Sequence, residues 1–185
     1  PFEIKKQSDV TEEFSFVQDQ FSFKLPWDSM SVKSVSRTFP DYFNEEQRRG
    51  VIIHELLSNV RYLDDFQRII AEVQLHNGEE SVYELELKKL RNEFESDTVV
   101  ASWFDSKSEV FTEQPVIDQK GNELRPDRIV RISGEIHVID FKTGEHDDKH
   151  IHQVKQYKEI LQSIYNEPVK GYLVYVLPLT VKEVD

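Results

Sequence analysis

The chain has 185 residues, no cysteine and a formal net charge of −12, with 38% hydrophobic and 11% aromatic residues. That length suffices for one domain with a substantial core, or for one domain with an appendage. The lack of cysteine excludes disulfides, zinc–thiolate sites and iron–sulfur clusters, and no apolar run approaches the roughly 20 residues of a membrane span.

These features favour a protein of the reducing cytoplasm over a membrane protein. The start at Pro1 and the charged ends of the chain indicate a piece excised from a longer polypeptide. Residues 1–43 contain short alternations of aromatic and polar positions, such as Phe14, Phe16, Phe21 and Phe23, without a clear partner strand. We therefore expect residues 1–43 to be an arm or linker and residues 44–185 to form the main domain.

The acidic balance of the whole chain argues against a free-standing, tight nucleic-acid binder, because affinity for a phosphate backbone comes largely from Lys and Arg. The stretch from Arg125 to Glu159 differs, since seven basic and seven acidic residues cancel within it. Cations bound to its carboxylates would make this stretch locally positive. The balance still indicates that another domain or partner delivers any nucleic-acid substrate.

Three helical patterns follow the predicted arm. Asn44 and the acidic residues after it are typical of a helix start, and apolar residues recur from Ile52 to Val60. Two further amphipathic patterns cover 64–76 and 80–94, separated by Asn77-Gly78. Both have ordinary core faces. Trp103 and Phe104 are expected to be core residues rather than exposed rings that stack on bases.

Gly50 and His54 are four residues apart and therefore share one side of the first predicted helix. Glycine inside a helix costs about 1 kcal/mol relative to alanine, so Gly50 predicts a close approach of another backbone. Taken alone, His54 is more simply a buried or boundary histidine than a ligand.

The second half of the chain changes to β-type composition. Strands are expected over 109–118, 124–132, 135–141 and 169–177, with a hairpin turn at Gly121-Asn122. Asp147 or Asp148 can cap a helix with apolar residues from Ile151 to Ile164. The order helix, three strands, helix, strand predicts an α/β fold with a mixed sheet flanked by helices.

Pro126-Asp127 and Asp140-Phe141-Lys142 fit the pattern PD-x(n)-(D/E)-x-K. Asp140 and Lys142 are two apart on one predicted strand, so both side chains project from the same face. Asp127, on the neighbouring predicted strand, can close a site for a divalent cation, and oxygen donors of this kind suit Mg²⁺. Such short patterns also arise by chance, but these residues lie at the end of an apolar strand, where a site can open to solvent.

Four segments in this order resemble the RecB-like nuclease domains of the PD-(D/E)XK superfamily, found at the C-termini of RecB- and AddA-type helicase–nucleases and in related exonucleases. They are GVIIHELL from Gly50, RPDRIV from Arg125, VIDFKTG from Val138 and QVKQY from Gln153. With the elements around them they cover about residues 45–177. The resemblance implies a restriction-endonuclease-like core of order α-βββ-α-β, with extra N-terminal helices.

The resemblance also implies roles for individual residues. His54, Asp127, Asp140 and the backbone carbonyl of Phe141 would bind the metal, and Lys142 would be the catalytic lysine together with Asp127 and Asp140. Gln153 and Tyr157 match the motif on the following helix, where such residues support the site and contact DNA, and Glu113 resembles an acidic residue that some members carry. Some relatives hold an iron–sulfur cluster through cysteines, so this chain resembles the cluster-free branch.

The function expected from this resemblance is a Mg²⁺- or Mn²⁺-dependent deoxyribonuclease. It would act as an exonuclease or end-processing module in DNA repair and recombination in the bacterial cytoplasm, with DNA ends as substrate and a fused or associated helicase motor. One alternative is a noncatalytic DNA- or partner-binding module that keeps the fold. Another is a stand-alone nuclease that acts on RNA or on invading DNA.

Overall fold

The structure, a computed structural model, describes residues 44–77 and 82–185, all of which belong to one compact unit, Val32–Asp185. The expected arm at 1–43 lies outside the described residues. So do Gly78 and Glu80, where the sequence predicts a turn and a helix start.

Five helices occur in the described part of the chain: α1 Glu45–Ser58, α2 Asp65–Asn77, α3 Val82–Ser96, α4 Thr98–Trp103 and α5 Asp148–Ile164. The helix start expected at Asn44 is confirmed, because its side chain accepts a hydrogen bond from the Gln47 N–H while the Gln47 side chain accepts from the Asn44 N–H. Asp147 caps α5 in a similar way through the N–H of Lys149. The short helix α4 was not expected.

A mixed sheet of five strands forms the centre of the domain: β1 Glu109–Thr112, β4 Arg128–Ile132, β5 Glu135–Lys142, β6 Val169–Val176 and β7 Leu179–Val184. The strands lie in the order β1-β4-β5-β6-β7, and only the β5–β6 pair is parallel. The short strands β2 Val116–Ile117 and β3 Glu123–Leu124 pair with each other as a separate hairpin. The predicted α/β class and mixed sheet are confirmed.

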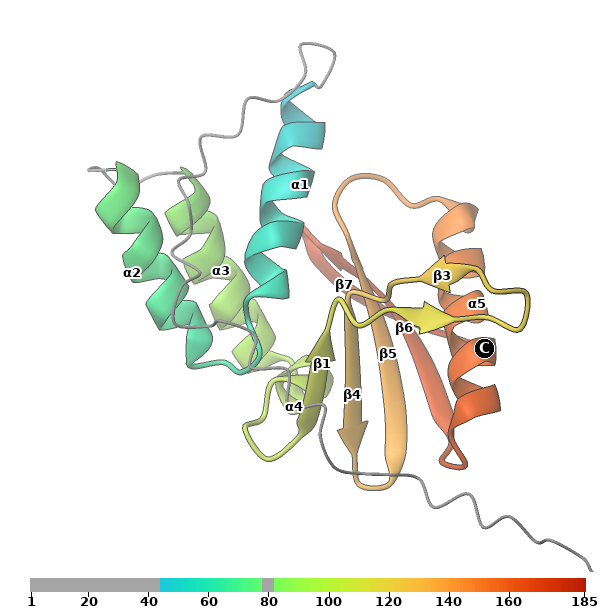
Figure 1. Cartoon of the computed structure of the whole chain (residues 1–185). Coiled ribbons are helices and arrows are strands. Elements are labelled where there is room, and N and C mark those ends of the chain that lie inside the picture. Colours follow the sequence, from blue (N-terminus) through green and yellow to red (C-terminus); the bar gives the residue numbers. More distant parts are fainter. Residues whose placement is uncertain (1–43, 78–81) are drawn as a thin grey trace, which may run out of the picture. The chain divides into compact units, whose positions relative to one another are not determined.

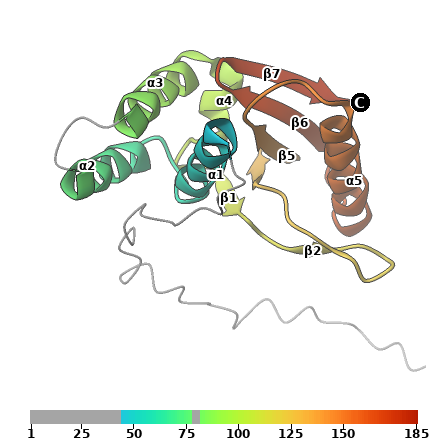
Figure 2. The same cartoon turned by 90° about the horizontal axis from the view of Figure 1, so that it is seen from above.

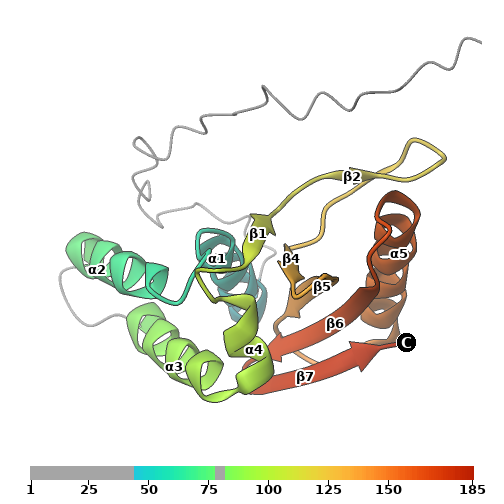
Figure 3. The ribbon, with the colours of Figure 1, turned by 90° about the horizontal axis from the view of Figure 1, so that it is seen from below.

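Helices cover both faces of this sheet (Figures 1 and 2). Helices α1 to α4 lie on one side of the sheet, with α2 packed on α3, and share a core that includes Trp103, Phe104 and Phe141. Helix α5 packs on the other face through Tyr157 and Leu161. Seen from below, α5 lies against β5 and β6 on the side away from α3 (Figure 3). The burial expected for Trp103 and Phe104 is confirmed, with exposures of 0% and 1%.

Glycine allows α5 to come close to the sheet. A Cβ atom added at Gly171 of β6 would lie 2.8 Å from Cγ1 of Val154 in α5, closer than van der Waals contact permits. The packing of α5 therefore depends on this position, and α5 carries Gln153 and Tyr157.

Two of the predicted strands are interrupted. The stretch expected as one strand over 124–132 divides into β3 and β4, so Asp127 lies in the link just before β4 and not within a strand. Pro126 lacks the N–H that a central strand would donate, which explains the break. The stretch 109–118 likewise divides into β1 and β2 at Glu113, which has a positive φ of 53°.

The last strand pair also differs from expectation. The buried strand predicted over 169–177 corresponds to β6, but β7 follows it after a tight turn and was not expected. One face of β7 is exposed, so its apolar content is too low to give a strong strand signal. Within the described residues, no helix has the length and apolar character needed to cross a membrane.

Candidate active site

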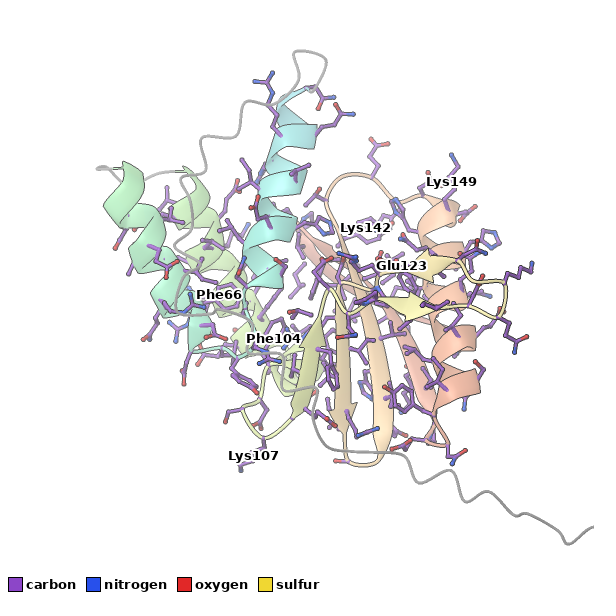
Figure 4. The ribbon with its side chains drawn as sticks, viewed as in Figure 1. Phe66, Phe104, Lys107, Glu123, Lys142 and Lys149 are labelled. Carbon is purple, nitrogen blue, oxygen red and sulfur yellow. The ribbon has the colours of Figure 1, made fainter. Side chains whose placement is uncertain are left out.

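Asp140 and Lys142 lie together at the carboxyl end of β5, as their spacing predicts. The Lys142 Nζ atom is 2.6 Å from Oδ2 of Asp140, and the side chains are 18% and 2% exposed. Figure 4 shows Lys142 at the end of the sheet, between α1 and α5. Oδ2 of Asp140 is buried, and the Lys142 ammonium group is its counter-charge.

Burial raises the pKa of the Asp140 carboxyl to about 6, and the negative charge of Asp127 adds to the shift against the opposing effect of Lys142. Two carboxylates therefore lie close enough to repel each other at one end of the sheet. An additional positive charge between them would relieve this repulsion.

Asp127 approaches Asp140 from the link before β4. Its Oδ2 atom accepts a hydrogen bond of 2.7 Å from the backbone N–H of Phe141, the residue between Asp140 and Lys142. β4 begins only at Arg128, which is paired with Ile139, so β4 does not extend as far as Phe141. The Asp127 carboxylate therefore takes the N–H of Phe141 that a neighbouring strand would otherwise have bonded. This hydrogen bond holds the Asp127 carboxylate against the carboxyl end of β5.

The Phe141 carbonyl faces the same side as its N–H, because the N–H and C=O of one strand residue point in the same direction. The N–H meets Asp127, so the carbonyl oxygen also lies on the Asp127 side of β5. The Phe141 side chain points into the core and stacks on Phe94, with ring centroids 6.1 Å apart. The carbonyl predicted as a metal ligand is thus directed towards the predicted side-chain ligands.

His54 reaches the same place from α1, about seventy residues earlier in the chain. Its Nδ1 atom is 3.6 Å from Oδ2 of Asp127, and its side chain is 31% exposed. Burial lowers the pKa of His54, but attraction to Asp127 outweighs burial and the net pKa is raised. The expectation that His54 lies beside Asp127 agrees with this geometry.

Gln153 and Tyr157 flank the site from α5. The Gln153 amide donates a hydrogen bond of 2.7 Å to the Tyr157 hydroxyl, which donates to the backbone carbonyl of Arg125 at 3.2 Å. Burial raises the pKa of Tyr157, and the negative charge of Asp140 adds to the shift, so the hydroxyl is neutral at physiological pH. Tyr157 therefore ties α5 to the segment that carries Asp127.

Glu113, the remaining predicted site residue, follows β1 directly. Its backbone N–H donates a hydrogen bond of 3.1 Å to the carbonyl of Asp127. Burial raises the pKa of its carboxyl, and the negative charge of Asp127 adds to the shift while His54 opposes it. Glu113 thus belongs to the same electrostatic cluster as Asp127 and His54.

Gly50 lies against the turn that follows β5, one helical turn before His54. A Cβ atom added there would be 2.5 Å from Oγ1 of Thr143. The close approach expected at Gly50 exists, but the neighbour is a side chain and not a backbone. A side chain at position 50 would require Thr143 to move, because α1 crosses the β5–α5 turn at the edge of the site.

Two structural features beside the site were not expected from the sequence. The hydroxyl of Tyr175, the residue paired with Lys142 on β6, is 3.0 Å from Nδ1 of His150 and accepts a hydrogen bond from the Asp147 N–H. These contacts hold the β5–α5 loop beside Lys142. The other feature is the buried side chain of Arg128, next to Asp127 in the chain.

The side chains fit a divalent cation in the kind of donor atom they offer. Asp127, Asp140 and Glu113 provide carboxylate oxygens, His54 an imidazole nitrogen and Phe141 a carbonyl oxygen, all of which are ligands of Mg²⁺ or Mn²⁺ sites. The buried Oδ2 atom of Asp140 faces the Lys142 ammonium group at 2.6 Å, so a cation bound there would share this oxygen with Lys142. Across 44–77 and 82–185, however, no three His, Asp or Glu side chains already have the spacing of a complete ligand set.

Comparisons with known proteins do not place the chain in a family. No family model matches it, and no curated protein does. A solved structure entitled "Crystal structure of SSO0001" is similar over 74% of this chain and 79% of that chain, with 19% sequence identity and a TM-score of 0.33.

Proposed function

We propose that the chain is a Mg²⁺- or Mn²⁺-dependent deoxyribonuclease with a RecB-like PD-(D/E)XK core. In this proposal it serves as the exonuclease or end-processing module of a helicase–nuclease in DNA repair and recombination. The observation that carries the proposal is the meeting of Asp127, Asp140 and Lys142 with His54. They come from α1, the link before β4 and the end of β5.

Each residue has a role that follows from its position. Asp127, Asp140 and His54, with the Phe141 carbonyl, would hold the cation, which when bound would supply Lewis-acid chemistry at the scissile phosphate. Lys142 lies beside Asp140, from where its ammonium group donates hydrogen bonds to the attacking water or to a phosphate oxygen. Such preorganised donors stabilise the charge that develops in the transition state.

Gln153 and Tyr157 position the substrate side of the site. Their mutual hydrogen bond fixes both side chains, and the neutral Tyr157 hydroxyl anchors the Arg125 backbone. The second N–H of the Gln153 amide can donate to a phosphate or sugar oxygen of the substrate without adding charge.

The test compares the wild-type chain with Asp140→Ala and Lys142→Met. We expect the wild type to cleave single- or double-stranded DNA with Mg²⁺ or Mn²⁺ and not with EDTA. Asp140→Ala should lose both cleavage and Mn²⁺ binding measured by calorimetry. The rate of DNA cleavage by Lys142→Met should be lower than that of the wild type by a factor of about 100 or more. It should bind Mn²⁺ at least as tightly as the wild type, because the ammonium group no longer competes for Asp140.

Metal-dependent cleavage that survives both substitutions would rule out this site. RNA substrates of the same sequence belong in the assay, because a preference for RNA would favour the stand-alone ribonuclease instead. Ser163→Ala, on the exposed end of α5 away from Gln153, is a control that should cleave like the wild type.

A noncatalytic DNA- or partner-binding module is the second candidate. It is favoured by the absence of a complete ligand set with metal-site spacing in the described residues. That candidate predicts DNA binding with equal affinity in EDTA and in Mn²⁺, no heat of Mn²⁺ binding, and no cleavage. The calorimetric titration therefore separates the two candidates before any nuclease assay.

A further inference from the structure

Arg128 is a buried charge without a carboxylate partner in the described part of the chain. Its residue is 1% exposed, and burial lowers the pKa of the guanidinium to about 9, which leaves it protonated at neutral pH. Burying an unpaired charge is expensive unless hydrogen bonds compensate it. The position of Arg128, directly after Asp127, raises the question of what this side chain does.

The guanidinium is satisfied by backbone carbonyls. Nη1 donates to the carbonyl of Val60 at 2.8 Å, Nη2 to those of Arg61 and Trp103, and Nε to that of Trp103 at 3.3 Å. Its flat face lies over the ring of Phe104, with Cζ 3.9 Å from the ring centroid. Phe104 lies at the base of the helical layer, beside the sheet (Figure 4).

These acceptors belong to two separate segments. Val60 and Arg61 follow the end of α1, the helix that carries His54, and Trp103 is the last residue of α4. Arg128 is the first residue of β4, so its side chain joins the ends of both helices to the point where the sheet meets Asp127. The N–H of Leu63 donates to the Phe104 carbonyl at 3.2 Å and links the two helix ends to each other.

We propose that Arg128 is a positioning residue: by clamping the carbonyls after α1 and α4, it sets the separation between His54 and Asp127 and so shapes the cation site. The residue adjacent to the clamp on one side is Asp127, and the helix held on the other side carries His54 six residues before Val60. Movement of the clamped segment relative to β4 therefore changes the separation of these two donors directly. The inference rests on the proposed function only for its consequence in cation binding.

Arginine is required for the geometry and not only for its charge. The planar guanidinium presents five donors in a fixed fork, whereas a lysine ammonium has three donors around one atom and no flat face to stack on Phe104. Arg128→Lys keeps the charge but has one nitrogen atom, which cannot take the places of Nε, Nη1 and Nη2 that bond the Val60, Arg61 and Trp103 carbonyls. The loss of outer contacts that orient metal ligands weakens metal affinity or activity by about 10- to 100-fold.

The experiment compares Arg128→Lys with Phe104→Leu and with Ile69→Ala. Phe104→Leu keeps the arginine but removes the ring stacked on it, together with the contacts of that ring to Phe66 and Phe94. Ile69 is a fully buried residue of α2 and serves as a control for lost stability. For each folded variant, the Mn²⁺ dissociation constant, kcat and KM for DNA are measured well below its unfolding midpoint. Crystal structures give the separation of His54 Nδ1 and Asp127 Oδ2.

We expect Arg128→Lys to weaken Mn²⁺ binding at least tenfold and to lower kcat about 100-fold with little change in KM. Phe104→Leu should show a smaller effect of the same kind, and Ile69→Ala should bind Mn²⁺ and cleave like the wild type. The His54–Asp127 contact should lengthen from 3.6 Å by more than about 1 Å in Arg128→Lys.

An unchanged His54–Asp127 contact, or losses equal to those of Ile69→Ala, would overturn the inference. If the wild type neither binds Mn²⁺ nor cleaves, the proposed function fails, and the crystallographic separation still decides the positioning role. If Arg128→Lys does not fold, Phe104→Leu provides the same comparison.

Discussion

Asp140 is held by the fold in an environment that disfavours its charged form. Its side chain is 2% exposed, Oδ2 has no well-formed hydrogen bond, and Asp127 contributes a second negative charge. Lys142 compensates only part of this effect, because the pKa still rises to about 6. Binding and catalytic sites commonly keep groups in such environments at the expense of stability.

This environment predicts a pH-dependent stability difference for Asp140→Asn. The folded domain binds the Asp140 proton more tightly than the unfolded chain, whose pKa is 3.8, so proton binding stabilises the wild type fully below pH 3.8. That stabilisation is lost as the pH rises through about 6. In EDTA at pH 8, we expect Asp140→Asn to be more stable than the wild type by about 1–3 kcal/mol.

Urea unfolding at pH 8, 6, 5 and 4 measures this difference, which should shrink towards low pH. Asp105→Asn, on the exposed α4–β1 loop, is the matched control, because it removes the negative charge of a carboxylate that is not buried. A difference between Asp140→Asn and the wild type that does not change with pH would contradict the prediction.

At the scale of elements, α1 and the β5–α5 turn are in contact at Gly50 and Thr143. Gly50→Ala would gain about 1 kcal/mol of helix propensity, but its Cβ would lie 2.5 Å from Thr143 Oγ1 and push α1 away from the turn. We expect the single variant to be less active and no more stable than the wild type. The double variant Gly50→Ala/Thr143→Ala should be more stable than Thr143→Ala by about 1 kcal/mol.

A double-mutant cycle of thermal unfolding and cleavage rate tests this contact. The coupling energy should exceed about 0.5 kcal/mol, as expected for residues in direct contact. Additive effects of the two substitutions would show that α1 and the turn are independent of each other.

The elements that the sequence predicts well are those with local signals. The cap at Asn44, the helical periodicity and the same-face spacing of Asp140 and Lys142 all depend on neighbours within four residues, and each agrees with the structure. The proximity of His54 to Asp127 follows from family resemblance, because no local rule joins residues that are about seventy apart.

The features missed in the sequence depend on contacts between distant segments. Arg128 bonds carbonyls 25, 67 and 68 residues away, and backbone acceptors leave no side-chain pattern to recognise. The position of Asp127 in a link arises because its carboxylate replaces a strand partner for Phe141. The edge strand β7 has an exposed face and lacks the apolar run that marks β6.

At the scale of the whole molecule, most basic side chains of the stretch from Arg125 to Glu159 already interact with protein groups. Five of the seven basic residues between Arg125 and Glu159 already bond protein groups. They are Arg125 with Glu123, Arg128 with carbonyls, Arg131 with Glu109, Lys142 with Asp140 and Lys158 with the Val184 carbonyl. The described part of this stretch therefore offers few unpaired cations to a phosphate backbone.

This charge distribution predicts weak DNA binding with a shallow salt dependence. Each phosphate neutralised by Lys or Arg adds about 0.7 to 0.9 to the slope of log affinity against log salt. For the Lys142→Met variant in Mg²⁺, we expect a slope no steeper than about −3 in fluorescence anisotropy between 50 and 200 mM NaCl. A slope of about −6 or steeper would identify a cationic surface outside the described residues and remove the need for a delivering partner.

The β2–β3 hairpin leaves the central sheet after Glu113, packs on α5 through Val116 and Leu124, and returns at Arg125. Both of its ends are held by hydrogen bonds. The Glu113 N–H bonds the Asp127 carbonyl, and the Arg125 carbonyl accepts from Tyr157. Because the base of the hairpin is held by these hydrogen bonds, we expect changes at the hairpin tip to have little effect on Asp127. Exposed loop tips tolerate changes of length and sequence, so we expect insertions at the hairpin tip to leave the position of Asp127 unchanged.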